Sequence, residues 1–173
     1  MNMRHLPRVN VTFFTALTII SLGCISAGSA QDSKDDANGA NPDDKPYHIE
    51  ADGTTDWPIF NGYRRYHSIC HTCHGPDGLG SSFGPNLTES LKHMTKDQFM
   101  DVVVNGRTNV STSSEKRMPA LGTDLNVMCY IDDIYAYLKA RSDGAIGRGR
   151  PQKHASKPQE AAEAEAACMG SGS

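Results

Sequence analysis

The segment CHTCHG, from Cys70 to Gly75, places two thiols and two imidazoles within five residues. Cys70 and Cys73 have the Cys-x-x-Cys spacing of a redox dithiol or of one half of a zinc site. When a histidine directly follows the second cysteine, as His74 does, the same spacing is the attachment signature of c-type haem. In that chemistry both thiols bond to the haem, and the imidazole binds its iron.

The dithiol and zinc alternatives account for fewer of these residues. A zinc site of this type needs two further ligands, and no second Cys-x-x-Cys segment occurs in the chain. A dithiol gives no role to His74, and no β-α-β pattern surrounds the motif. The spacing therefore favours covalent haem attachment, with zinc and dithiol chemistry as the remaining alternatives.

Residues 1–30 have the pattern of a secretory signal peptide. Two arginines precede an apolar core over residues 11–22, which is too short to span a bilayer comfortably. Small residues at 28–30 form a cleavage site, so we predict cleavage after Ala30. A lipoprotein attached at Cys24 and an uncleaved anchor are the alternatives. Export places the thiols in an oxidising compartment, which favours a covalently held cofactor.

The composition restricts the partners and the number of domains. The chain has 173 residues, with 17 Lys and Arg against 20 Asp and Glu. Loss of two arginines with the signal peptide gives 15 − 20 = −5, so no basic surface for nucleic acid is expected. We predict a disordered acidic leader over residues 31–55, one folded domain over residues 56–141, and a C-terminal arm with a short helix over residues 142–173.

Three segments have the apolar periodicity of amphipathic helices, which predicts an all-α domain. They lie at residues 57–70, 95–106 and 126–141. Gly62 is unfavourable inside a helix, so we expect a second helix to approach closely there. Thr95 and Gln98 have the spacing of a capping box at the start of the second helix.

A closed iron site needs a second axial ligand opposite His74. Met118 is a candidate because KRMPALG predicts a loop, in which Pro119 holds the preceding backbone extended. Met94 and His93 are the alternatives on these grounds.

Four segments together resemble the class I cytochromes c. They are Gly62 with Tyr66 before the CHTCHG motif, GPNL at residues 84–87, MPALG at residues 118–122 and YLKAR at residues 137–141. The resemblance covers residues 56–141 and implies the class I fold, with three core helices around one covalently bound haem c. It also implies that Tyr137 packs near Gly62 where two helices cross.

The resemblance assigns roles to individual residues around the haem. Cys70 and Cys73 would hold it covalently, and His74 and Met118 would be the axial ligands of its iron. The carbonyl of Pro85 would accept a hydrogen bond from the Nδ1–H of His74, which fixes the tautomer and orientation of the imidazole.

A narrower resemblance is to the methanol-metabolism-related c-type cytochromes. It depends on the two cysteines outside the haem motif and on the arm DGAIGRGRP at residues 143–151. It implies a periplasmic one-electron carrier, not an enzyme and without a membrane segment after signal cleavage. The electron donor would be a PQQ-dependent methanol or alcohol dehydrogenase, and the acceptor another soluble cytochrome c. A cytochrome subunit of a stable dehydrogenase complex and a peroxidase-type haem enzyme are the alternatives.

Cys129 and Cys168 are the two cysteines that remain in the exported chain outside the motif. An even number of spare thiols in an oxidising compartment predicts a disulfide between them. The bridge would attach a short C-terminal helix near residues 157–170 to the last core helix.

Overall fold

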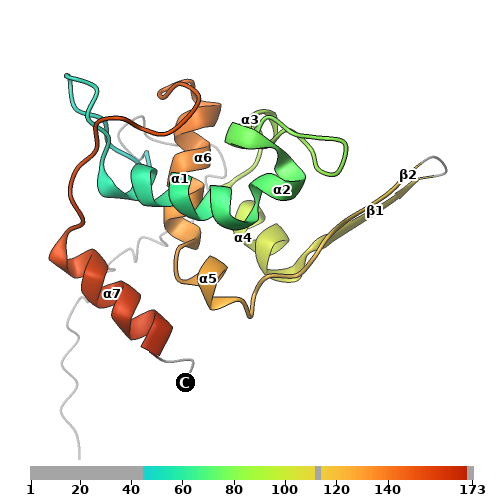
Figure 1. Cartoon of the computed structure of the whole chain (residues 1–173). Coiled ribbons are helices and arrows are strands. Elements are labelled where there is room, and N and C mark those ends of the chain that lie inside the picture. Colours follow the sequence, from blue (N-terminus) through green and yellow to red (C-terminus); the bar gives the residue numbers. More distant parts are fainter. Residues whose placement is uncertain (1–44, 112–113, 171–173) are drawn as a thin grey trace, which may run out of the picture. The chain divides into compact units, whose positions relative to one another are not determined.

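The computed structural model describes residues 45–111 and 114–170, which belong to one compact unit. The predicted signal peptide and the leader up to residue 44 lie outside these residues. The described elements are α1 (Trp57–Ile69), α2 (His71–His74), the 3-10 turn η1 (Pro76–Gly78), α3 (Leu87–Ser90), α4 (Lys96–Asn105), β1 (Arg107–Ser111), β2 (Ser114–Met118), α5 (Leu125–Met128), α6 (Ile131–Ser142) and α7 (Gln159–Gly170) (Figure 1). The fold is mainly helical, as predicted, with one added hairpin.

Helices α1 and α6 cross at Gly62 (Figure 1). A Cβ atom on Gly62 would lie 1.9 Å from the carbonyl oxygen of Asp133 and 2.8 Å from the Cβ of Tyr137. Because no side chain fits in that space, the two backbones can meet only at a glycine. The close approach expected from the sequence is present, and Tyr137 packs edge-on against Tyr63 at the same crossing, with ring centroids 5.6 Å apart.

Helix α4 begins where its sequence predicts. The Thr95 side chain accepts from the Gln98 N–H at 3.2 Å, and the Gln98 side chain accepts from the Thr95 N–H at 3.0 Å. This capping box satisfies two backbone donors that the first turn cannot pair. Phe99 and Val103 are then buried against the core formed with α1 and α6.

The last predicted core helix, residues 126–141, is divided in two. The Asp124 side chain caps α5, which ends at Met128, and α6 starts at Ile131. Tyr130 lies between them with a non-helical φ of −133° and is buried beneath the Arg65 guanidinium, 3.4 Å from its ring centroid. Apolar periodicity continues through this break, which is why the sequence alone predicted one helix.

Strands β1 and β2 form an antiparallel hairpin in a segment predicted to be a loop near Met118. Arg107 pairs with Met118, and Thr108 pairs with Arg117. Met118 is therefore the last residue of a strand, and Pro119 follows it. The hairpin joins α4 to the chain that returns toward α5, as Figure 1 shows.

The packed region begins before residue 56, which the sequence analysis predicted as the start of the folded domain. The Tyr47 hydroxyl donates to Asp143 at 2.9 Å, and Thr55 is 4% exposed. The C-terminal arm returns to this segment: the Thr55 N–H donates to the Lys153 carbonyl, and the Ala155 N–H donates to the Thr55 carbonyl. Residues 45–55, predicted as the end of a disordered leader, are thus ordered by a segment about a hundred residues further on.

Helix α7 is attached to the core by the expected disulfide. Cys129 and Cys168 are bonded, with their Cα atoms 5.7 Å apart. Glu165 adds ion pairs to Arg65 at 3.5 Å and to Lys157 at 2.6 Å. The predicted C-terminal helix is present, with Gly170 as its last residue. None of the helices within residues 45–111 and 114–170 has the length and hydropathy of a membrane-spanning segment.

Candidate functional site

An apolar cavity of about 260 Å³ opens beside the CHTCHG motif. Cys70, Cys73 and His74 lie on its wall together with Met118. The remaining lining residues are mainly apolar and come from α1, α3, α4, α5, α6 and the adjoining loops: Ile69, Phe83, Gly84, Pro85, Leu87, Ser90, Met94, Phe99, Val102, Val103, Arg107, Arg117, Pro119, Leu121, Val127, Ile131, Ile134 and Leu138. Two thiols, an imidazole and thioethers around a large apolar space fit a covalently held haem.

A single helical turn brings the attachment residues together. The Cys70 carbonyl accepts from the N–H of Cys73 at 3.2 Å and from the N–H of His74 at 3.0 Å. Residues three and four apart in a helix share a face, so the two thiols and the imidazole lie on one side of the turn. Burial, with a smaller effect of Cys73, raises the pKa of the Cys70 thiol to about 11.

The imidazole of His74 is held in one orientation. Its Nδ1 lies 3.1 Å from the carbonyl oxygen of Pro85. A carbonyl can only accept, so Nδ1 carries the proton and Nε2 keeps the lone pair that a metal would need. Gly84 permits this contact, because a Cβ there would lie 2.9 Å from Nδ1 and 2.8 Å from the Cys73 carbonyl oxygen.

Two of the three candidate sixth ligands line the cavity. Met118 and Met94 both contribute to its wall, and both are partly buried against the core. His93 is not among the lining residues. The structure thus reduces the choice to two thioethers and leaves the assignment of Met118 to the family resemblance.

The chain after the motif is tied to α1. The Tyr66 hydroxyl donates to the carbonyl of Gly75 at 2.6 Å, within the core. The Gly80 N–H donates to the His74 carbonyl at 2.7 Å, which closes the loop back onto the motif. These bonds restrain the chain directly after His74.

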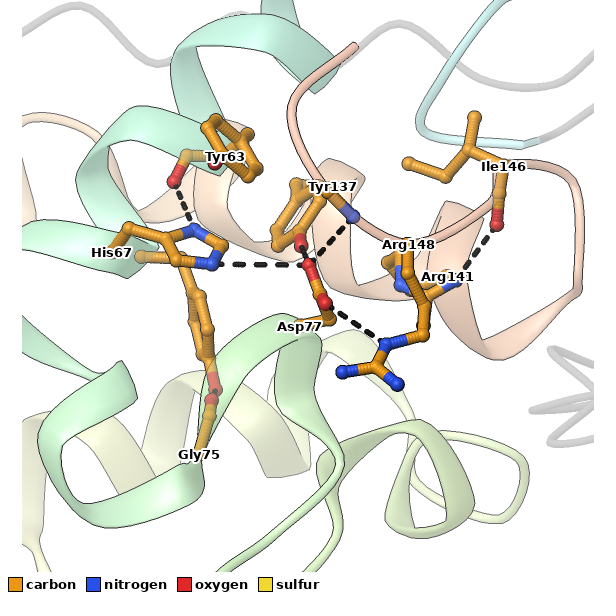
Figure 2. Close-up of polar contacts among 10 residues, drawn as sticks. Tyr63, His67, Gly75, Asp77, Tyr137, Arg141, Ile146 and Arg148 are labelled. Atoms are coloured by element: carbon orange, nitrogen blue, oxygen red, sulfur yellow. Dashed lines mark hydrogen bonds and ion pairs between the residues drawn. The ribbon is translucent and has the colours of Figure 1, made fainter.

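Asp77 links this segment to α6 and to the C-terminal arm (Figure 2). Its side chain accepts from the Gly149 N–H at 2.9 Å, from the Arg148 Nε at 3.2 Å and from the Tyr137 hydroxyl at 3.3 Å. His67 Nε2 is 3.8 Å away. Asp77 is 5% exposed and has a φ of 60°, which few residues other than glycine adopt. A buried residue in this conformation indicates that the surrounding contacts determine the backbone.

Asp77 is ionised at neutral pH. Burial opposes its negative charge, but the Gly149 N–H and Arg148, followed by Arg141 and His67, outweigh that effect and lower the pKa of the carboxyl. Burial first, and then the Asp77 carboxylate, raise the pKa of Tyr137, so its hydroxyl remains a donor.

Sequence reasoning found the attachment residues but missed part of the site. It did not identify Arg107 and Arg117, which line the cavity from the hairpin, or Asp77 and Phe83. Asp77 occurs in the segment GPDG, which predicts an exposed turn. Nothing in that segment predicts that its carboxylate is buried. Only the position of the C-terminal arm explains the role of that residue.

Comparison with known proteins relates the chain to bacterial cytochromes. A family model described as cytochrome C oxidase, cbb3-type, subunit III, matches residues 59–138. Cytochrome c-553I of Paracoccus denitrificans is 48% identical over 71% of this chain, and the match spans 54% of the relative, about half its length. Cytochrome c-555 of Methylococcus capsulatus (Bath) is 41% identical over 57% of this chain and 74% of the relative. The crystal structure of the c-type cytochrome XoxG from Methylobacterium extorquens AM1 aligns with a TM-score of 0.60 and 38% identity, over 72% of this chain and 82% of that one.

The chain belongs to the class I c-type cytochromes, with covalently bound haem c as its cofactor. Within that class it belongs to the methanol-metabolism-related group, which agrees with the narrower resemblance seen in the sequence. Proteins of this kind are electron carriers and not enzymes, which removes the peroxidase alternative.

Proposed function

We propose that this cytochrome accepts single electrons from a PQQ-dependent methanol or alcohol dehydrogenase in the periplasm and passes them to another soluble cytochrome c. The observation that carries the proposal is the apolar cavity with Cys70, Cys73, His74 and Met118 on its wall. Membership of the methanol-related group, through the similarity to XoxG and to cytochrome c-555 of Methylococcus capsulatus, supports the choice of donor.

In this proposal Cys70 and Cys73 hold the haem through thioether bonds, and His74 and Met118 bind its iron. Haem c, when bound, supplies a one-electron couple between ferric and ferrous iron. The Pro85 carbonyl keeps the His74 proton on Nδ1, so that Nε2 is available to the metal. A thioether ligand favours the ferrous state, as a carrier that receives electrons requires.

Apolar residues that line the cavity keep water away from the haem site. Val103, Val127, Ile134 and Leu138 line it and are almost fully buried, so they exclude water from that wall. A dry wall reduces the solvent rearrangement that accompanies a change in iron charge. With both axial positions filled by the chain, substrates have no place to bind.

The remaining parts of the proposal concern processing. Residues 1–30 would direct export and be removed, and residues 56–141 would hold the haem. Residues 142–173 would form the C-terminal arm and short helix that pack on the surface of the haem domain. Cleavage after Ala30 predicts an N-terminal glutamine in the mature protein, which mass spectrometry of the exported chain tests.

Stopped-flow mixing of the oxidised cytochrome with purified PQQ-dependent methanol dehydrogenase, reduced by methanol, tests the donor. We expect reduction to follow second-order kinetics in the two proteins, and the reduced protein then to reduce a second soluble cytochrome c. A dehydrogenase that uses another cofactor is the matched control. Equal rates with both dehydrogenases, or no reduction by the PQQ enzyme, would contradict the proposed donor.

A further inference from the structure

A second cavity lies between α7 and the helices α1 and α6, and we call it the α7 pocket. Its volume is about 170 Å³, and its walls come from the first half of α1, the residues around Tyr130, the first turn of α6 and one face of α7. It shares no lining residue with the haem cavity. A single water needs only about 10–15 Å³, so the α7 pocket has room for a ligand of several non-hydrogen atoms.

The charged residues that line the α7 pocket are all acidic in the part of the chain that the structure describes. Two of them have cationic partners: Lys96 lies 2.7 Å from Asp132, and Lys157 lies 2.6 Å from Glu165. The third, Asp133, forms no ion pair with a Lys, Arg or His side chain within residues 45–111 and 114–170. A partly buried carboxylate without a counter-ion favours a cation beside it.

An independent observation points to a ligand with a hydrogen-bond donor. Asn61 lines the α7 pocket and is 2% exposed. Its Nδ2 donates to the Asp133 carboxylate at 2.7 Å, which identifies the other amide atom as the oxygen. Within the described chain that buried Oδ1 accepts no hydrogen bond. Buried polar atoms are nearly always paired, so the pocket offers an acceptor that needs an N–H or O–H from a bound group.

The surroundings of Asp133 add to the demand for positive charge. Burial raises the pKa of its carboxyl, although the hydrogen bond from Asn61 opposes this effect. Asp132 and Asp56 raise that pKa further, and Arg65 lowers it. The Asp133 anion is thus destabilised where it lies, and a bound cation would remove that penalty.

The rest of the wall suits an alkyl group attached to the cation. Trp57 and Tyr130 supply aromatic rings, and Ala161 supplies a methyl group. Both rings already face cations of the chain: the Arg65 guanidinium lies 3.4 Å from the Tyr130 ring centroid, and the Lys157 Nζ lies 6.0 Å from that of Trp57. Aromatic faces attract positive charge and also pack against carbon chains, so this wall tolerates both parts of an organic cation.

We propose that the α7 pocket binds the ammonium group of a primary alkylamine through Asn61 Oδ1 and the Asp133 carboxylate. Its alkyl chain would lie against Trp57 and Ala161. A primary ammonium carries both the positive charge that Asp133 lacks and the N–H that Asn61 needs. A metal ion does not fit, because no three His, Cys, Asp or Glu side chains in the described residues are placed to hold one. The bound ion would contact α1, α6 and α7 together and so hold α7 against the core.

Nuclear magnetic resonance of the ¹⁵N-labelled, reduced holo-cytochrome tests this site, with methylammonium chloride as the probe. The Asn61 side-chain amide and the backbone N–H groups around the pocket should shift saturably at constant ionic strength. Tetramethylammonium chloride is the control, because it has the same charge but no N–H, and it should cause no saturable shift. Equal shifts with the two salts would overturn the proposal. No shift with methylammonium would also overturn it and would mean that water alone occupies the pocket. Tighter binding of Ca²⁺ than of methylammonium at the same residues would overturn the ligand class.

Three variants locate the site. Asp133→Asn should weaken methylammonium binding at least about tenfold, because it removes a hydrogen bond to a charged group. Ala161→Leu keeps every charge but fills the pocket, and it should abolish binding. Glu163→Gln is the matched control: it removes an acidic side chain from the exposed surface of α7, outside the pocket lining, and should bind as the wild type does.

The haem absorbance spectrum and the melting temperature show whether each variant folds. Ala161→Leu decides the question if Asp133→Asn does not fold, and wild-type binding by Ala161→Leu would overturn the location of the site. Nα-acetyl-lysine amide as a second probe distinguishes the two sources of a primary ammonium. Tighter binding of this compound than of methylammonium would assign the pocket to a lysine side chain of another protein, and weaker or equal binding would assign it to a free small amine.

Discussion

The contacts of Asp77 predict how strongly the C-terminal arm stabilises the haem domain. Asp77→Ala removes an acceptor from the buried Tyr137 hydroxyl and from the N–H of Gly149, which is an exposed residue. The unpaired Tyr137 hydroxyl costs roughly 1–3 kcal/mol, and the loss at Gly149 costs about 1 kcal/mol because water can replace the carboxylate there. The ion pair with Arg148 adds little, because 67% of that side chain is exposed. We expect the free energy of unfolding to fall by roughly 2–4 kcal/mol in total.

Urea unfolding of the holo-protein, followed by far-UV circular dichroism, measures this loss. Arg148→Gln is the matched control and should cost less than about 1 kcal/mol, because it leaves the bonds from Tyr137 and Gly149 in place. An Asp77→Ala protein as stable as the wild type would refute the idea that this carboxylate holds the arm. Equal losses in both variants would refute the assignment of the effect to the Tyr137 and Gly149 donors.

The same carboxylate predicts a pH dependence. The folded pKa of Asp77 lies below its usual value of 3.8, so the unfolded chain binds this proton more readily than the folded protein does. The contribution of the ionised Asp77 side chain to the free energy of unfolding is complete above pH 3.8. That contribution is lost as the pH falls through the pKa of Asp77 in the folded protein. The stability difference between wild type and Asp77→Asn should therefore shrink when unfolding is measured at pH 3 instead of pH 7.

Three further predictions concern the haem ligand, the disulfide and the helix crossing. Met118→Ala should abolish the near-infrared band of sulfur-ligated ferric haem and lower the midpoint potential by on the order of 0.1 V, whereas Met94→Ala should change neither; the opposite result would make Met94 the ligand. Cys168→Ala should reduce the free energy of unfolding by roughly 3–4 kcal/mol, since the bridge closes a loop of 39 residues, and two free thiols by mass in the native wild type would contradict the bridge. Gly62→Ala should impair folding, because its methyl carbon would lie 1.9 Å from a carbonyl oxygen of α6, and normal yield with an unchanged melt would show that the helices can separate.

Features that depend on neighbours in the chain could be predicted from the sequence. The Cys-x-x-Cys-His spacing places its side chains on one helical turn, whatever the rest of the molecule does. The capping box of Thr95 and Gln98 also follows from local geometry. The glycine at residue 62 indicated a close helix contact because a glycine is unfavourable inside a helix, and the structure shows that α6 makes that contact. The pairing of Cys129 with Cys168 needed only a count of thiols and the compartment.

Features that depend on distant segments meeting were decided by the tertiary structure. The helix breaks at Tyr130, where that side chain is buried under Arg65 of another helix. Residues 45–55 are ordered because the arm supplies bonds to Thr55 from residues about a hundred positions away. Asp77 is ionised although buried because Gly149 and Arg148 of the distant arm bond to it. Burial, charge and backbone conformation at these positions depend on which surfaces come into contact, and a pattern of neighbouring residue types does not contain that information.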